Sequence, residues 1–175
     1  MDLGRRTLLK GLLLAPLGLT LPVTGSAGNE RRLAFYHTHT GESLSLVYHD
    51  GQDYLSDSLE SIDNYLRDFR TGEIQSIDRK LLDQLFAVKQ LTGSRGVFEV
   101  ISGYRSPKTN AALRGKSGGV AKKSLHMQGR AIDVRLTDVP STSIRKVALA
   151  LQSGGVGYYH KSDFVHLDTG PFRTW

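Results

Sequence analysis

A ten-residue stretch, Ser124–Asp133, reads SLHMQGRAID and places an imidazole and a carboxylate seven positions apart. Gly129 lies between them and favours a bend, so the two side chains need not share a helix. A second stretch, Phe164–Asp168, reads FVHLD and supplies another imidazole from a short apolar run. Two histidines and one carboxylate are a recurrent ligand set in catalytic zinc sites, where a fourth position stays open. We therefore expect one Zn²⁺ ion to be held by His126, Asp133 and His166.

The residues around both motifs predict β-strands. In Ala131–Leu136, Ile132 and Val134 point to the face opposite Asp133, because side chains alternate along a strand. A lone carboxylate inside a strand is costly unless it is paired or bound to a cation. Residues 156–159 and 164–168 predict a closing hairpin that brings the second histidine beside the first strand.

The rest of the chain predicts an α+β fold. Strand patterns cover residues 33–37, 44–48 and 97–101, and helical apolar spacing covers residues 56–70, 78–91, 107–113 and 142–152. We expect an antiparallel sheet that carries the metal site and packs against these helices. Between residues 114 and 124 lies a basic, glycine-containing segment, which fits either a solvated linker or a lid over a substrate cleft.

Composition excludes several kinds of site. The chain has 175 residues and no cysteine, which rules out thiolate metal sites, disulfides and a cysteine nucleophile. Its formal net charge is +6. Removing Arg5, Arg6, Lys10 and Asp2 leaves 20 basic and 16 acidic residues, a net charge of +4. No lysine-rich tail or aromatic–basic interleaving accompanies this mild charge, so we expect no nucleic-acid partner.

Residues 1–27 predict a targeting segment, with Arg5, Arg6 and Lys10 before a moderately apolar stretch and small residues at 25–27. The paired arginines resemble a twin-arginine (Tat) signal, although Gly4 stands where Ser or Thr is common. An ordinary Sec signal or an uncleaved anchor is the alternative. We expect contact with the membrane only during export, and one domain over residues 28–175.

Two further histidines, His37 and His39, lie two positions apart on a predicted strand end. Histidines at this spacing can share a metal ion. Because no acidic or third ligand is evidently placed with them, the sequence favours exposed loop and strand-end histidines without a metal.

The spaced motif carries a family resemblance. Ser124, His126, Gly129, Ala131 and Asp133, followed by a distal strand histidine, resemble the zinc peptidases of the lysostaphin, D-Ala-D-Ala-carboxypeptidase and Hedgehog superfamily. Further stretches resemble the periplasmic murein endopeptidases of that superfamily; they are residues 39–42, 102–106, 119–124, 154–159 and 164–170. The resemblance implies a Hedgehog-like α+β fold, a periplasmic location and hydrolysis of peptide cross-links in peptidoglycan.

Roles for other residues follow from the same resemblance. Asp163 stands where the family usually has a glutamate as general base, and His160 is a weaker candidate for that role. Arg105 matches an arginine that binds the substrate's carboxylate or carbonyl, and Ser124 matches a serine that contacts the substrate. Asp168, two residues after His166, shares its strand face, so we expect it to orient that histidine or a neighbour.

Three functions remain open at this point. The leading hypothesis is a monomeric zinc endopeptidase that cleaves peptidoglycan cross-links containing D-Ala or meso-diaminopimelate. The first alternative is a D,D- or L,D-carboxypeptidase that trims a terminal residue of the stem peptide. The second is a zinc-bearing module that binds the cell wall without catalysis.

Overall fold

The computed structural model describes residues 29–116 and 118–175, so the predicted leader lies outside the described residues. Seven strands form one sheet in the order β2-β1-β3-β4-β6-β5-β7. Their bounds are β1 Arg31–His37, β2 Ser43–His49, β3 Phe98–Ser102, β4 Ala131–Leu136, β5 Gly155–Tyr159, β6 Phe164–Asp168 and β7 Arg173–Thr174.

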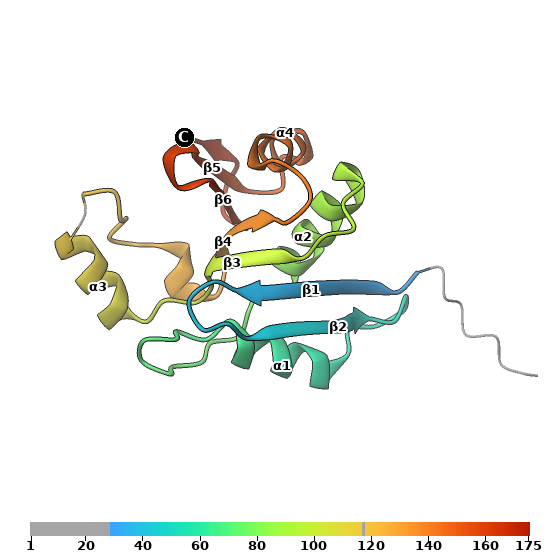
Figure 1. Cartoon of the computed structure of the whole chain (residues 1–175). Helices are drawn as coiled ribbons and strands as arrows, with labels where there is room; N and C mark the ends of the chain where they lie inside the picture. Colours follow the sequence, from blue (N-terminus) through green and yellow to red (C-terminus); the bar gives the residue numbers. More distant parts are fainter. Residues whose placement is uncertain (1–28, 117) are drawn as a thin grey trace, which may run out of the picture.

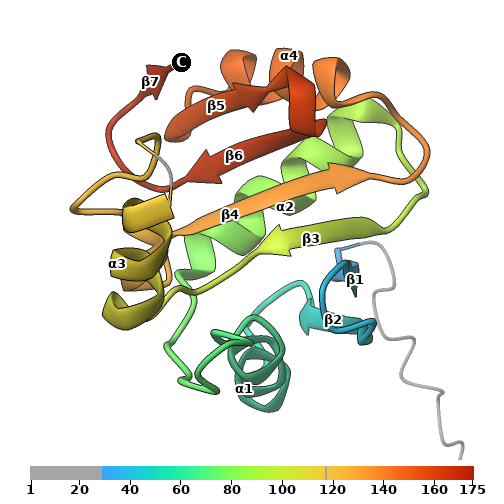
Figure 2. The ribbon, with the colours of Figure 1, turned by 60° about the vertical axis from the view of Figure 1, so that its left-hand side comes forward.

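Four α-helices and two short 3-10 helices connect the strands. The helices are α1 Ser56–Tyr65, α2 Arg79–Thr92, α3 Pro107–Lys116 and α4 Ser141–Leu151, and the 3-10 turns are η1 Leu125–Gln128 and η2 His160–Ser162. In Figure 2, α2 and α4 lie behind β4, β6 and β5, and α1 lies beneath β1 and β2. No helix in the described part of the chain has the length and apolar character needed to cross a membrane.

The sheet is mixed as a whole, which corrects the expectation of an antiparallel sheet, although β4 and β6, which carry Asp133 and His166, are antiparallel as expected. Parallel pairing occurs between β1 and β3 and between β5 and β7, while the other neighbours are antiparallel. The first parallel pair arises because α1 and α2 carry the chain from the β1–β2 hairpin to the side of β1 opposite β2, where β3 lies (Figure 1). A crossover of this length is what a parallel pair requires, and no sequence pattern specified it.

The helix-facing side of the sheet forms the hydrophobic core. Ile132 and Val134 of β4 and Val165 and Leu167 of β6 are fully buried in that core. Because side chains alternate along each strand, Asp133 and His166 point to the opposite face. The core therefore fixes which face of the sheet carries the polar site.

Helix α1 ends five residues earlier than predicted, since the apolar spacing continues to Phe69 but the helix stops at Tyr65. Tertiary contacts explain the early end. The Leu66 carbonyl accepts a hydrogen bond from the Tyr104 N–H (2.9 Å), and buried Asp68 accepts one from the Ser106 N–H (2.9 Å). The segment after α1 thus anchors the loop that follows β3 instead of continuing the helix.

Candidate metal centre

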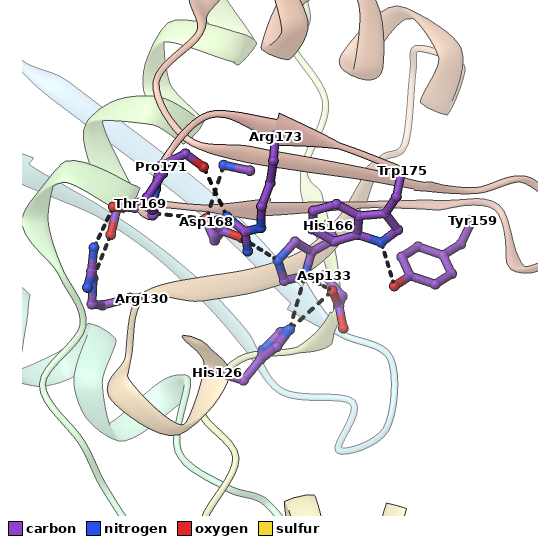
Figure 3. A network of polar contacts seen from close by, with 12 residues as sticks. His126, Arg130, Asp133, Tyr159, His166, Asp168, Thr169, Pro171, Arg173 and Trp175 are labelled. Atoms are coloured by element: carbon purple, nitrogen blue, oxygen red, sulfur yellow. Dashed lines mark hydrogen bonds and ion pairs between the residues drawn. The ribbon is translucent and has the colours of Figure 1, made fainter. Parts of the chain in front are cut away.

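One row of residues across the sheet brings the predicted ligands together. Register pairs Ser102 of β3 with Asp133 of β4, Asp133 with His166 of β6, and His166 with Gly157 of β5. Paired residues on neighbouring strands share a sheet face. His126 enters from η1, which begins just before β4 and crosses the end of this face (Figure 3). Gly129, with φ +66°, ends η1 in the left-handed conformation and provides the bend that the glycine predicts.

Each imidazole ring makes a hydrogen bond through the nitrogen that points away from the cluster. This outer contact sets the direction of the inner nitrogen, which points into the cluster. His126 Nδ1 lies 2.7 Å from the Gly103 carbonyl oxygen, and His166 Nε2 lies 2.9 Å from an Asp168 carboxylate oxygen. A nitrogen facing such an acceptor carries the proton, so the other ring nitrogen has the free lone pair. His126 Nε2 and His166 Nδ1 therefore face each other and Asp133. Acceptors that hold the outer nitrogen orient histidine ligands in the same way in metal sites.

The separations between these donors fit one tetrahedral ion. His126 Nε2 is 3.2 Å from His166 Nδ1 and 3.3 Å from Asp133 Oδ1, and His166 Nδ1 is 2.9 Å from the same oxygen. Tetrahedral zinc with bonds of about 2.0–2.1 Å separates its ligands by roughly 3.3 Å. All three residues are buried, and this is the one group of three potential metal ligands in residues 29–116 and 118–175. The residues present therefore fit a metal such as zinc.

Burial and close charges set the protonation of the cluster. Burial lowers the pKa of His126, and the opposing effect of Asp133 does not overcome it. Burial also acts to lower the pKa of His166, but hydrogen bonds to Asp133 and Asp168 outweigh burial and raise that pKa. For Asp133, burial raises the pKa, yet the two histidines outweigh it and hold that pKa well below its usual range. Asp133 is therefore ionised at neutral pH and supplies the negative charge that a bound cation needs.

Comparison with known proteins gives the family. The family described as peptidoglycan L,D-endopeptidase MepK matches residues 25–175 of this chain. The chain is 44% identical over 178 residues to the peptidoglycan L,D-endopeptidase MepK of Escherichia coli, covering 99% of this chain and 98% of that protein. It is 41% identical over 151 residues to the probable MepK of Haemophilus influenzae, covering 86% and 81%. This chain belongs to the MepK family.

The MepK family match contains the whole candidate centre, since residues 25–175 include every strand and helix described above. The resemblance to murein endopeptidases is thereby confirmed. The cluster of His126, Asp133 and His166 is also the arrangement that the motif predicted.

A cavity of about 430 Å³ adjoins the centre, and it is lined by both predicted substrate-binding residues, Arg105 and Ser124. Arg105 donates from Nε to Ser102 Oγ (2.8 Å) and from a terminal nitrogen to Asp133 Oδ2 (2.5 Å), with His126 Nε2 3.1 Å from that nitrogen. Its guanidinium therefore supports the ligand carboxylate as well as facing the cavity. Ser124 precedes η1 but its hydroxyl makes no capping bond, so that the hydroxyl is not committed to the turn.

The predicted base, Asp163, is not brought to the cluster. It is exposed, ends η2 in the left-handed conformation with φ 49°, and is not among the residues that line the cavity. Asp163 precedes His166 by three positions, a distance of about 10 Å along an extended chain. His160, in the same turn, contacts the Tyr158 hydroxyl at 3.2 Å and likewise does not line the cavity.

Asp168 is fully buried behind His166, and both of its oxygens are used. Oδ1 accepts from the N–H groups of Gly155 (3.0 Å) and Gly170 (2.8 Å), and Oδ2 accepts from His166. Arg173 contacts both oxygens, at 3.1 and 2.7 Å (Figure 3). Burial raises the pKa of Asp168, but these partners outweigh burial and lower it strongly.

Sequence reasoning missed β7 and the two residues it brings to the cavity, Arg173 and Trp175. A strand of two residues has no periodicity to detect, so no signal pointed to it. From its sequence, the basic segment between residues 114 and 124 fits either a linker or a lid. Part of it, residues 119–121 and 123, lines the cavity, and Asn110 of α3 donates a hydrogen bond to the Ala121 carbonyl (3.1 Å).

Proposed function

We propose that this protein is a zinc-dependent endopeptidase that hydrolyses peptide cross-links in peptidoglycan. The observation that carries the proposal is the convergence of two imidazole lone pairs and one ionised carboxylate at tetrahedral spacing, beside an open cavity. The relatives are named peptidoglycan L,D-endopeptidases, which supports this substrate and an endo mode of cleavage.

The bond proposed is an amide between an L-configured and a D-configured centre. Meso-diaminopimelate carries one centre of each configuration, so a cross-link through this residue offers such a bond. Cross-links that contain D-Ala are the other candidate. The cavity suits an anionic stem peptide, because Arg105, Lys123 and Arg173 line it and the carboxylate of Asp133 is already occupied by its partners.

Each residue has a defined task in the proposed reaction. The ion would be held by His126, Asp133 and His166. When bound, it would act as a Lewis acid that polarises the scissile carbonyl and activates water. Asp168 keeps His166 in the tautomer that presents Nδ1 inward. Arg105 is proposed to bind a substrate carboxylate or carbonyl, and the free hydroxyl of Ser124 to bind the peptide backbone.

Asp163 remains the proposed general base. In this role the β5–β6 turn adopts a second conformation that carries the Asp163 carboxylate into the cavity. Its neighbour Phe164 already lines the cavity, and the proposal requires the turn to move so that Asp163 joins it there. Asp163→Asn is expected to lower kcat at least a hundredfold with unchanged zinc content. Near-normal turnover in this variant removes Asp163 from the mechanism.

Digestion of purified murein, with and without EDTA, tests the function itself. If cross-linked dimers are lost, and EDTA prevents that loss, the result supports an endopeptidase. Shortened monomers with intact dimers identify a carboxypeptidase instead, and binding to murein without any new product identifies a non-catalytic module. Metal analysis of the purified protein tests whether the ion is zinc.

The proposal also covers location and fold. A peptidoglycan substrate places the enzyme outside the cytoplasm, and we propose export through a Tat-type signal in residues 1–27, followed by one domain of the Hedgehog and D-Ala-D-Ala-peptidase type. Replacing Arg5 and Arg6 by lysine is expected to retain the precursor in the cytoplasm. Export that continues unchanged excludes the Tat route. An experimental structure that superposes on that fold type tests the last point.

A further inference from the structure

We infer that Trp175 is a specificity-determining residue of this centre, an aromatic wall against which the aliphatic part of a stem peptide packs. The inference rests on the proposed function. Trp175 lines the cavity beside His166, with the two ring centroids 5.2 Å apart (Figure 3). It is nevertheless 48% exposed, so a large part of the indole is left for a ligand to cover.

The backbone holds Trp175 in a single place. Its N–H donates to the Val156 carbonyl (3.3 Å), and its carbonyl accepts from the Tyr158 N–H (3.0 Å). The indole Nε1–H donates to the Tyr159 hydroxyl (3.1 Å), and the Arg173 guanidinium lies 5.1 Å from the ring centroid. A side chain fixed by several bonds loses little conformational entropy when a ligand packs on it.

Gly157 provides the room that the indole occupies. It is the β5 member of the row that contains Asp133 and His166. A Cβ atom at this position would lie 2.5–2.7 Å from three atoms of the Trp175 ring. The ring thus fills the place of the missing side chain, one strand away from the ligand histidine.

The cavity then has two chemically different walls. Trp175, Tyr159 and Phe164 form an aromatic wall, in which the last two rings are stacked with centroids 4.5 Å apart. Lys123, Ser124 and Arg105 supply polar and cationic groups to the same cavity. A chain with methyl or methylene groups and a nearby carboxylate matches both walls, and this is the chemistry of D-Ala and diaminopimelate in stem peptides.

Steady-state kinetics on a purified cross-linked muropeptide dimer test the wall. Trp175→Ala is expected to raise KM about tenfold, as loss of one well-packed aromatic contact does. We expect kcat within about threefold of wild type and unchanged zinc content, while Trp175→Phe restores most of the KM. Gly157→Ala should raise KM in the same way, since it displaces the indole without removing it. The matched control is Phe172→Ala, because Phe172 is 46% exposed in the same segment but does not line the cavity.

Trp175 is the single tryptophan of the chain, so intrinsic fluorescence reports on this wall directly. Titrating the EDTA-treated wild-type protein with the dimer is expected to give a saturable emission change and protection from acrylamide quenching. This arm remains decisive even if the protein hydrolyses no murein, which separates the inference from the proposed function. An emission spectrum that the dimer does not change overturns the inference. An unchanged KM in Trp175→Ala, or a loss confined to kcat and zinc content, also overturns it, because Trp175 would then only support His166.

Discussion

Two pairs of histidines lie close together in this protein, and they differ in what their nitrogens face. The rings of His126 and His166 have centroids 5.0 Å apart, and those of His37 and His39 are 6.0 Å apart. In the first pair, Gly103 and Asp168 occupy the outer nitrogens and leave two inner lone pairs beside Asp133. Proximity of imidazoles alone is therefore not what makes a metal site.

The second pair uses its nitrogens differently. His37 Nδ1 accepts a hydrogen bond from the His39 backbone N–H (3.2 Å), which leaves the proton on Nε2. That Nε2 is buried and has no hydrogen-bond partner in the described part of the chain, while the ring meets Phe69 edge-on at 5.2 Å. His39 stacks on the same Phe69 at 4.8 Å. The nearby carboxylate, Glu42, is engaged by Arg67 (2.9 Å). The pair is an aromatic packing unit, and the expected exposure of His37 is wrong because its ring is 1% exposed.

The largest expected difference between the two pairs is in metal binding. His166→Ala removes one of the three proposed ligands and is expected to reduce the zinc content from one ion per chain to near zero after dialysis. His37→Ala is expected to retain the full ion. Elemental analysis of both variants, with circular dichroism to confirm folding, makes the measurement. Equal zinc loss in the two variants would contradict the assignment of the site.

The next effect concerns the support of His166. Asp168→Ala removes the acceptor that orients the imidazole and is expected to weaken zinc affinity about 10- to 100-fold. Competition with a chromophoric chelator measures the affinity. Glu99→Ala is the matched control, because Glu99 is also a strand carboxylate paired with an arginine, Arg135, but it neither belongs to the cluster nor lines the cavity. Unchanged affinity in Asp168→Ala would mean that packing alone orients His166.

A pH effect distinguishes His37 from a solvated histidine. Burial lowers its pKa, so below about pH 6.5 the unfolded chain takes up a proton that the folded protein does not. The contribution of His37 to the free energy of unfolding therefore falls as pH drops, by at most about 1.4 kcal/mol per pH unit. Urea unfolding of the EDTA-treated protein at pH 7.5 and 5.5 is expected to show a smaller loss in His37→Phe than in wild type. Parallel losses would contradict a buried neutral His37.

The smallest expected effect is that of replacing Glu42, the carboxylate near the His37–His39 pair. Glu42→Ala breaks an ion pair with Arg67 in which the glutamate side chain is 44% exposed. Exposed ion pairs are screened by solvent, so we expect a loss of at most about 0.5 kcal/mol in the free energy of unfolding and no change in zinc content. Thermal unfolding and metal analysis of this variant complete the comparison. Measurable zinc loss in Glu42→Ala would contradict this expectation, because it would link the two histidine pairs.

Much of the candidate site was readable from local sequence. Gly129 marked the bend after η1, and alternation in Ala131–Leu136 separated Asp133 from the apolar core. The spacing of Asp168 from His166 placed both on one strand face, and they are in contact. Local geometry decides these features, because backbone bends and strand alternation depend on nearby residues only.

Other features depend on contacts between distant segments. The helix after residue 56 ends early because Leu66 and Asp68 bind the loop after β3, about 40 residues away in the chain. The parallel pairing of β1 with β3 follows from packing of the intervening helices, and the position of Asp163 follows from the conformation of the β5–β6 turn. Such features are decided by long-range packing energies that no local pattern encodes.

The sequence alone predicts two histidines and one aspartate as metal ligands, the bend between His126 and Asp133, and the alternation of polar and apolar side chains along residues 131–136. Only the tertiary structure decided that Asp133, His166 and Gly157 fall in one row, with Trp175 filling the place beside them. The physical reason is strand register. A shift of one residue would turn every side chain of a strand to the other face, and only the packed core selects the correct pairing.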